Sequence, residues 1–292
     1  MKRTNPYLAA SLQAEQVVRQ RGISRFPVDP IIIARDLDIE VVAKPASAKG
    51  VSGILLRAGD SYGIAYATHI DNPGFQRFSI AHELGHYFLP GHLDAVLGDR
   101  DVHESHAEFA SADRYELEAD HFAASLLMPR CLFSTALRRA DDGIAAVERL
   151  ADICGTSLTS TAIRYTQCTS DPVAIVVSTG GSIDYCFVSD ALRDRDGFDW
   201  IRMRQAVPRT APTFAFNSDP EKVRRANRIA EESNLQIWFG GSRSIELSED
   251  VIGSAGTERH SLCSMALSFP VILTKTTMTH SPSRGRPTST DS

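Results

Sequence analysis

The sequence predicts an α+β fold, and three observations support this class. Two β-like runs at residues 51–57 and 61–67 are followed by a helical segment that begins near Pro73. From Pro172 onward, short β-like runs alternate with glycine turns. The chain has 292 residues, of which 42% are hydrophobic and 23% charged, so it can bury a full core and form two domains.

Composition excludes several classes of protein. The net charge of -5 argues against a chain built as a whole to bind nucleic acid. No basic segment with an apolar core follows the N-terminus, and no apolar run approaches the roughly 18 residues of a membrane span, so we expect a cytoplasmic protein that does not contact a membrane. The five cysteines are widely spaced without a C-x-x-C pair, which indicates neither a disulfide framework nor a thiolate zinc site.

The N-terminal region reads as helix, helix, strand. Residues 6–22 place apolar positions among polar ones and end at Gly22, which predicts a helix with a glycine stop. In the next segment Asp29 can cap a short helix with Pro30 at its first position, and this helix runs to Leu37. Residues 39–42 then read as a strand.

The two β-like runs that follow form a predicted hairpin around the turn at residues 58–60. An extended peptide can pair with an exposed sheet edge, and residues 63–67 are our candidate for such an edge. The alternative is a strand that only packs beneath the next helix.

That next helix carries an H-E-x-x-H pattern. Its cap is Asp71 or Asn72, and it must stop by Pro90. Positions four apart share a helix face, so His82 and His86 can direct two imidazole nitrogens at one ion while Glu83 stands beside them. This arrangement is typical of a zinc hydrolase, which needs a third protein ligand and a water.

The third ligand is expected on a later helix. Residues 92–113 read as a polar surface loop, and residues 115–128 are strongly helical. Glu116 and Asp120 share the face that continues into the core, so Glu116 can ligate the ion while Asp120 accepts a hydrogen bond from a ligating histidine. Glu118 falls on the opposite face and is expected to meet solvent.

His92 is the rival third ligand. It stands six residues after His86, which is the spacing of the third histidine in H-E-x-x-H-x-x-G-x-x-H. The glycine of that pattern is replaced here by Leu89, and the nearest glycine is Gly91. We therefore favour Glu116 and keep His92 as the alternative.

Two segments together resemble the ImmA/IrrE family of metallopeptidases. They are R-F-S-I-A-H-E-L-G-H-Y-F at residues 77–88 and E-x-E-A-D-x-F-A-A-x-L-L-M-P at residues 116–129, and the start of the second helix at Pro27–Pro30 is similar too. The resemblance covers about residues 5–165. It implies a zincin-like endopeptidase domain with one zinc ion per chain. In that family's pattern His82, His86 and Glu116 are the ligands and Glu83 is the general base.

The resemblance also implies a biological role. Several members of that family cleave a helix-turn-helix repressor and so switch on stress or mobile-element genes. We therefore expect a zinc endopeptidase whose partner is a protein substrate, with such a repressor as the best candidate. The alternative is a non-enzymatic regulatory module on a zincin scaffold, although a binding-only protein has no physical need for the base Glu83.

The predicted organisation has four parts. Residues 1–130 form the zincin-like domain, and residues 131–169 form a helical extension whose helix, glycine turn and helix outline a helix-turn-helix unit. Residues 130–165 carry five arginines against four acids, so packing against the peptidase domain is favoured over direct DNA binding.

The last two parts are a smaller domain and a tail. Residues 170–275 form a C-terminal α+β domain, which by resemblance could be a sensory module or could be purely structural. Its expected elements are hairpins around residues 179–181 and 240–241 with a charged helix at residues 219–233 between them. Residues 276–292 are rich in Ser, Thr, Pro and Arg and are expected to be disordered.

Overall fold

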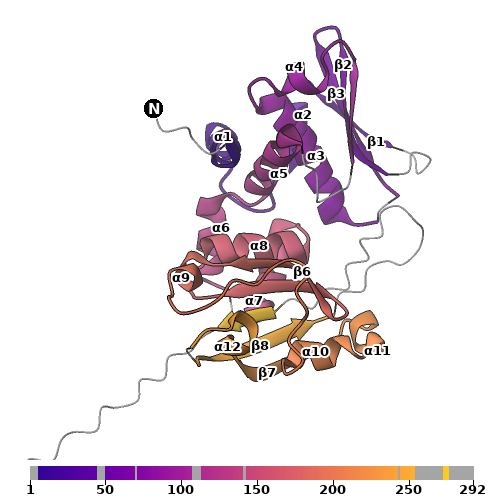
Figure 1. The fold of residues 1–292 in the computed structure, drawn as a ribbon. Helices are drawn as coiled ribbons and strands as arrows, with labels where there is room; N and C mark the ends of the chain where they lie inside the picture. The colour runs from indigo at the N-terminus through magenta and orange to yellow at the C-terminus, as the bar shows by residue number, and fades with distance from the viewer. Residues whose placement is uncertain are drawn as a thin grey trace, which may run out of the picture.

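The structure, a computed structural model, confirms the α+β class. It describes residues 6–44, 50–69, 71–106, 113–140, 143–242, 244–253 and 272–275. The predicted tail at residues 276–292 lies outside these ranges. The N-terminal part, at the top of Figure 1, contains α1 (Pro6–Gln20), α2 (Pro30–Arg35), β1 (Glu40–Lys44), β2 (Val51–Ala58), β3 (Ser61–Ala67), α3 (Pro73–Phe88), α4 (His92–Val96), β4 (Val102–His106) and α5 (Arg114–Leu127).

Local signals explain where the early helices start. The Asp29 carboxylate accepts a hydrogen bond from the Ile31 backbone nitrogen at 2.9 Å, with Pro30 at the first position of α2. The Asn72 side chain accepts from the Phe75 backbone nitrogen at 3.1 Å, with Pro73 at the start of α3. The capping residues of both helices are therefore among those that the sequence predicts.

The N-terminal sheet has the strand order β1-β3-β2-β4. Strand β3 pairs in parallel with β1 and antiparallel with β2, so the prediction that residues 63–67 form a sheet edge is wrong. The edge beside α5 is instead β4, which pairs with β2 through Leu55 opposite His103. Strand order depends on long-range pairing, which a local sequence pattern does not contain.

The prediction of a plain surface loop at residues 92–113 is also wrong. Residues 92–106 of this segment contain α4 and β4, while residues 107–112 lie outside the described ranges. Strand β4 has the sequence Val-His-Glu-Ser-His, which lacks the apolar alternation that normally identifies a strand. The segment forms a strand because it pairs with β2, and no alternation of apolar residues marks it in the sequence.

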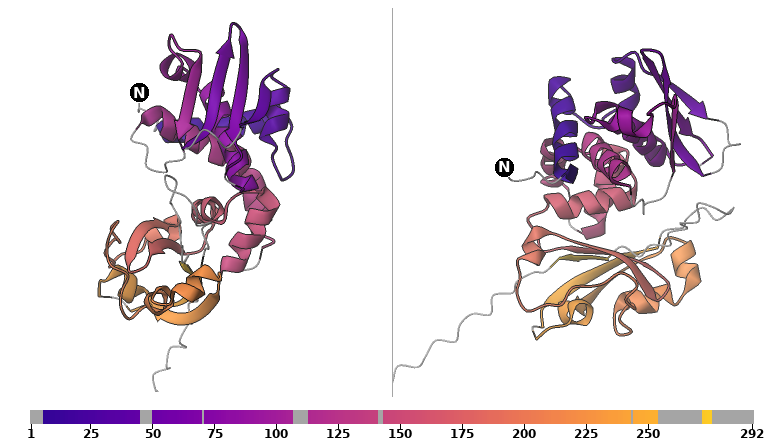
Figure 2. Two further views of the ribbon diagram at one scale, coloured as in Figure 1. Left: turned by 90° about the vertical axis from the view of Figure 1, so that its right-hand side faces the viewer. Right: turned by 45° about the horizontal axis from the view of Figure 1, so that its top comes forward.

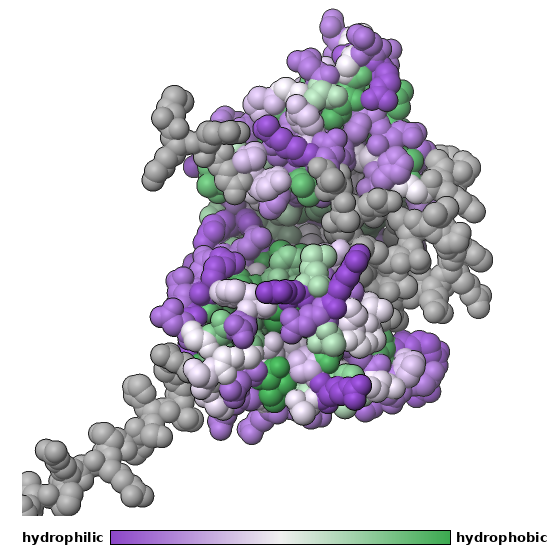
Figure 3. Space-filling view, in the orientation of Figure 1, coloured by the Kyte–Doolittle hydropathy of each residue, from purple (hydrophilic) through white to green (hydrophobic). Residues whose placement is uncertain are grey.

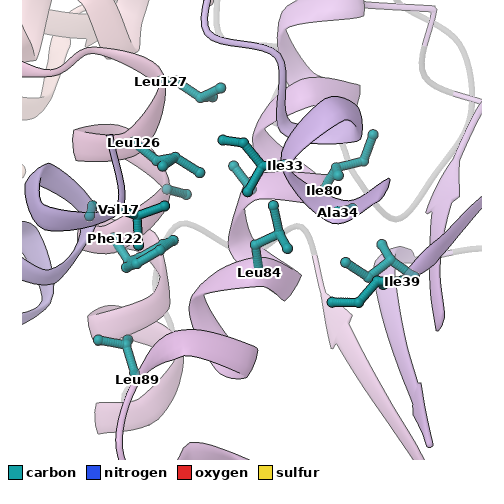
Figure 4. Close-up of a cluster of buried hydrophobic side chains, with 14 of the residues drawn as sticks. Val17, Ile33, Ala34, Ile39, Ile80, Leu84, Leu89, Phe122, Leu126 and Leu127 are labelled. Carbon is teal, nitrogen blue, oxygen red and sulfur yellow. The ribbon is translucent and has the colours of Figure 1, made fainter. Parts of the chain in front are cut away.

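The hydrophobic core of the N-terminal part lies where α1, α2, α3 and α5 meet one another and the sheet (Figure 4). Phe122 and Leu126 of α5 are fully buried, as are Ile80 and Leu84 of α3. The residues facing this core recur at three- and four-residue steps along each helix, as the amphipathic pattern requires. This packing fixes α3 and α5 side by side.

Three helices lie between the two sheets: α6 (Arg130–Leu137), α7 (Gly143–Cys154) and α8 (Leu158–Cys168), as Figure 2 shows from two further sides. A helix-turn-helix protein must expose its second helix to read DNA. In α8 only Gln167 is exposed, and Thr161, Ala162 and Tyr165 are buried. This burial supports the packing interpretation of the helical extension.

The C-terminal part is a five-stranded sheet in the order β6-β5-β9-β8-β7, with short helices beside it. Its elements are β5 (Ala174–Thr179), β6 (Ser182–Val188), α9 (Asp190–Arg193), α10 (Pro212–Asn217), α11 (Pro220–Arg224), β7 (Arg228–Asn234), α12 (Leu235–Phe239), β8 (Glu246–Ile252) and β9 (Ile272–Lys275). All of its strand pairs are antiparallel.

The first predicted hairpin of this part is present as β5 and β6, but the prediction of a second hairpin around residues 240–241 is wrong. Residues 235–239 form helix α12, because the Asn234 side chain caps the segment and Leu235, Trp238 and Phe239 bury one helical face. The predicted helix at residues 219–233 covers only α11. Its second half is strand β7, which pairs with β8.

The hydrophobic core of the middle helices continues into the C-terminal sheet. One cluster joins Val147 and Leu150 of α7 and Tyr165 of α8 to Ile175 and Val177 of β5. A further cluster fills the other side of the sheet beneath α12. The predicted division of the chain into domains stays a prediction.

The surface agrees with the composition of the chain. On the face seen in Figure 3, hydrophobic residues occur in small groups among hydrophilic ones. Among the residues that the structure describes, no helix combines the length and the apolar character needed to span a membrane.

A buried arginine ties the middle helices to the N-terminal part. Arg164 of α8 donates to the Met128 carbonyl oxygen at 2.9 Å and to the Glu15 carboxylate of α1 at 3.2 Å. The same Glu15 carboxylate accepts from the Arg130 backbone nitrogen at 2.6 Å. One ion pair therefore links α1, the start of α6 and α8.

Replacing Arg164 with Ala should destabilise the protein. The change leaves the Met128 carbonyl and the Glu15 carboxylate without their charged donor, so we expect the free energy of unfolding to fall by about 2–4 kcal/mol. Guanidinium unfolding measures this loss, with the exposed Arg139→Ala as a matched control. Equal unfolding midpoints for the two variants would contradict the role of this ion pair.

Candidate metal centre

Helices α3 and α5 bring His82, His86 and Glu116 together, so that one donor atom from each lies within 4.8 Å of the others. The His82 and His86 Nε2 atoms are 3.0 Å apart. The two Glu116 carboxylate oxygens lie 3.2 Å from His82 Nε2 and 3.4 Å from His86 Nε2. The three side chains predicted as ligands thus converge on one point.

Close packing of the two helices makes this convergence geometrically feasible. Gly85 lies between the two histidines along α3, and a Cβ placed on it would lie 3.1 Å from Ala119 Cα and 3.2 Å from the Ala119 carbonyl oxygen. Glycine therefore lets the α5 backbone approach α3 closely, so that the short Glu116 side chain reaches both rings.

The spacing of the donor atoms suits a tetrahedral ion. Zinc bonds of about 2.0–2.1 Å in tetrahedral geometry hold neighbouring ligand atoms about 3.3 Å apart. The three separations, from 3.0 to 3.4 Å, fall around this value. Two imidazole nitrogens and a carboxylate are also a donor set that zinc accepts at sites that keep an open position.

The electrostatics of the three side chains follow from burial and from their contacts. Burial would lower the pKa of His82, but hydrogen bonds to Asp120 and Glu116 outweigh it and raise the pKa to about 10. Burial lowers the pKa of His86 to about 3. Burial alone would raise the pKa of Glu116, yet the contacts of its carboxylate with the imidazole rings of His103, His82 and His86 hold it far below its usual range. Glu116 is therefore ionised and suited to hold a cation.

Glu83 lies beside this group and is fully buried. Both of its carboxylate oxygens lack a hydrogen-bond partner among the described residues. Burial raises the pKa of the Glu83 carboxyl. An unpartnered buried carboxyl is costly, so its presence next to three side chains that could hold a metal ion calls for a functional explanation.

Asp120 lies where its predicted supporting role requires. Its Oδ1 atom is 2.8 Å from His82 Nδ1, one helical turn after Glu116 on α5. The Nδ1–H group of His82 therefore donates to a carboxylate, which leaves Nε2 directed at the ligand group. The role of Asp120 in metal binding stays a prediction.

His92 and Glu118 are placed differently from the sequence analysis. His92 Nδ1 is 3.2 Å from His86 Nδ1, the nitrogen of His86 that faces away from Glu116. His92 belongs to neither group of converging donor atoms. The expectation that Glu118 meets solvent is wrong, because it is 8% exposed and lies 3.1 Å from His92 Nε2. Helix α4 covers that face of α5, which a helical wheel drawn for α5 alone cannot show.

His103 of β4 is a site residue that the sequence reasoning did not single out. Its Nε2 atom lies 3.0 Å from Glu116 Oε1 and 3.3 Å from Ser105 Oγ. It also forms a second group of converging donor atoms with Glu83 and His86. In the sequence, His103 is one of several histidines in a polar stretch. The pairing of β4 with β2 is what brings it beside Glu116.

Gly53 of β2 provides the space for the Glu83 carboxylate. A Cβ on Gly53 would lie 2.3 Å from Glu83 Oε1, closer than any real contact. We expect Gly53→Ala to displace Glu83 and to lower any Glu83-dependent activity by about 10-fold or more, within the range for losing a positioned general base. Activity and circular dichroism should be measured together. Gly181→Ala is the control, because a Cβ there meets nothing within 4 Å. Full activity of Gly53→Ala would contradict the packing described here.

Comparisons with known proteins bear on the fold and the family of the chain. No curated protein matches the chain. A solved structure of a Mycobacterium tuberculosis transcriptional regulator is similar, with a TM-score of 0.58 and 15% sequence identity, over 92% of this chain and 76% of that chain. At this identity the likeness concerns the fold alone. Residues 34–166 match the family model described as IrrE N-terminal-like domain, Peptidase_M78. This range contains every residue of the converging groups, and the resemblance to the ImmA/IrrE metallopeptidases is thereby confirmed.

Proposed function

We propose that this chain is a zinc-dependent endopeptidase in which His82, His86 and Glu116 hold one ion and Glu83 is the general base. The observation that carries the proposal is a group of three converging donor side chains beside a buried carboxyl that has no hydrogen-bond partner. Three side chains converge, with the two histidine Nε2 atoms and the two Glu116 oxygens separated by 3.0 to 3.4 Å, close to the spacing of ligands around a tetrahedral ion. Beside them stands a buried carboxyl with both oxygens unpartnered.

The chemistry divides between the ion and the protein. When bound, zinc supplies a Lewis acid that polarises a carbonyl group and lowers the pKa of a water molecule. Glu83 accepts the proton of the attacking water and delivers it to the leaving amine nitrogen. Burial raises the pKa of the Glu83 carboxyl above its ordinary value, and a raised pKa makes the carboxylate a stronger base.

Strand β4 is the part of the fold suited to hold the substrate. It is an edge of the N-terminal sheet and carries His103, which contacts Glu116. An extended peptide that adds to this edge would form main-chain hydrogen bonds along β4. This pairing would lay the peptide across the group formed by Glu83, His86 and His103.

The proposed substrate is a protein regulator, with a helix-turn-helix repressor as the best candidate. The family resemblance supports this class, and the similar solved structure is itself named a transcriptional regulator. A cut between the DNA-binding and dimerising parts of a repressor would separate its paired half-site contacts and so abolish tight binding. One proteolytic event would then relieve repression.

A non-enzymatic binding role is the competing function, and Glu83 argues against it. A binding module gains nothing from an unpartnered buried carboxyl, which costs stability. The neighbouring Gly53, which leaves room for that carboxylate, fits the same view.

Replacing Glu83 with Gln tests the proposal. The amide keeps the shape of the side chain but cannot accept the proton, so cleavage should fall by at least about 100-fold while zinc binding is retained. The assay incubates the zinc-loaded full chain with repressors encoded near it and with casein. Two discrete repressor fragments and little casein cleavage are expected. The exposed Glu231→Gln is the control, and normal turnover by Glu83→Gln would show that the base is misassigned.

Replacing Glu116 with Ala tests the ligand set without substrate. One of three protein ligands is lost, so zinc affinity should drop by about two orders of magnitude or more. Competition with a chromophoric chelator measures the dissociation constant. Glu104→Ala, an exposed carboxylate on β4, should leave that constant unchanged. If Glu116→Ala binds zinc as tightly as the unchanged chain, another side chain is the third ligand.

A further inference from the structure

A line of buried polar side chains stands behind His86, on the side away from Glu116. His86 Nδ1 is 3.2 Å from His92 Nδ1, and His92 Nε2 is 3.1 Å from Glu118 Oε2. At the end of the line, the exposed Arg114 donates through Nε to Glu118 Oε1. The line runs from α3 through α4 to α5, so it joins three of the elements that lie around the metal centre.

The position of each proton in this line follows from what each group can donate. A carboxylate only accepts hydrogen bonds, so the proton of His92 lies on Nε2 and points at Glu118. A histidine that binds an ion through Nε2 carries its one remaining proton on Nδ1, so a His86 bound in this way would donate from Nδ1 to the facing His92 Nδ1. His92 Nδ1 is therefore a bare acceptor. The short contact between the two Nδ1 atoms then needs the proton of His86 on its own Nδ1.

This arrangement leaves the Nε2 lone pair of His86 free. Nε2 is the atom that lies 3.0 Å from His82 Nε2 and 3.4 Å from Glu116 Oε1. The tautomer that the buried line selects is thus the one that can bind a metal ion through Nε2.

We propose that His92 and Glu118 are positioning residues that hold His86 in the tautomer with its proton on Nδ1 and so direct its Nε2 lone pair at the metal. The proposal rests on the proposed metal centre. It replaces the alternative in which His92 is itself a ligand, because the His92 ring faces Nδ1 of His86, whereas Glu116 lies at Nε2.

The two histidines of α3 are then supported in different ways. His82 donates directly to the Asp120 carboxylate, which is 34% exposed. On the Nδ1 side of His86, the His92 imidazole lies between the His86 ring and the Glu118 carboxylate of α5. Support of this kind behind a ligand commonly changes metal affinity by about 10–100-fold when it is removed.

The test compares two replacements of His92 in the full chain. His92→Phe keeps a planar ring but has no acceptor. His92→Asn places a carbonyl oxygen near the position of Nδ1, so it can still accept from His86. The exposed His106→Phe on β4 is the matched control. Each variant is titrated with zinc against a chelator, and long-range hydrogen–nitrogen NMR of the metal-free chain reports the His86 tautomer.

The expected result is a split between the two variants. The zinc dissociation constant should rise about 10–100-fold for His92→Phe but no more than about threefold for His92→Asn and His106→Phe. The Nδ1–H tautomer of His86 should persist in His92→Asn and be lost in His92→Phe. An unchanged His86 tautomer in a folded His92→Phe would overturn the proposal, as would equal weakening by Phe and Asn.

Two further outcomes stay informative. If circular dichroism shows that His92→Phe does not fold, Glu118→Leu decides, because leucine keeps a side chain at this buried position but has no atom that can accept a hydrogen bond from His92. A mixture of His86 tautomers in that variant supports the proposal, and an unchanged tautomer overturns it. If the unchanged chain bound zinc but cleaved nothing, only the proposed peptidase activity would fail, since the titrations and the NMR involve no substrate.

Discussion

The metal centre depends on how closely α3 and α5 approach each other. Gly85 of α3 faces the Ala119 backbone of α5 so closely that a Cβ added to Gly85 would lie only 3.1 Å from Ala119 Cα. At this separation a glutamate at the start of α5 can reach both histidines of α3, and Asp120 can reach His82 from behind. A wider crossing would leave Glu116 short of His86. Much of the core of the N-terminal part, from Phe122 and Leu126 outward, serves to hold the two helices at this distance.

Buried polar groups around the centre fall into two kinds. The side chains that support the ligands are hydrogen-bonded: Asp120 to His82, His103 to Glu116, and His92 to both His86 and Glu118. A satisfied network of this kind costs little and fixes ring orientation. Glu83 is the other kind, buried without a partner. An unpartnered carboxyl among hydrogen-bonded neighbours fits the general-base role that we propose for Glu83.

The sequence predicted those parts of the site that depend on neighbours along one helix. His82, Glu83 and His86 follow from a five-residue pattern, and Glu116 with Asp120 follows from a four-residue step on an apolar helix. It missed what depends on pairing between segments. The order of strands made β4 the edge in place of residues 63–67, and this pairing placed His103 at the centre. The same limit applies to the C-terminal part, where a short apolar run was read as a strand but forms a capped helix.

The cluster that joins the middle helices to the C-terminal sheet bears on how the molecule unfolds. Val147 and Leu150 share one core with Ile175 and Val177 of β5, while Arg164 ties the same helices to α1. The middle helices α6–α8 are therefore packed against the C-terminal sheet and tied to the N-terminal part. Unfolding of either part removes contacts of these helices and exposes buried apolar surface. We therefore expect the N-terminal part, the middle helices and the C-terminal sheet to unfold together in one cooperative transition. Cutting the chain at residue 169 to isolate the metal centre would open this core, so a stable fragment must keep β5.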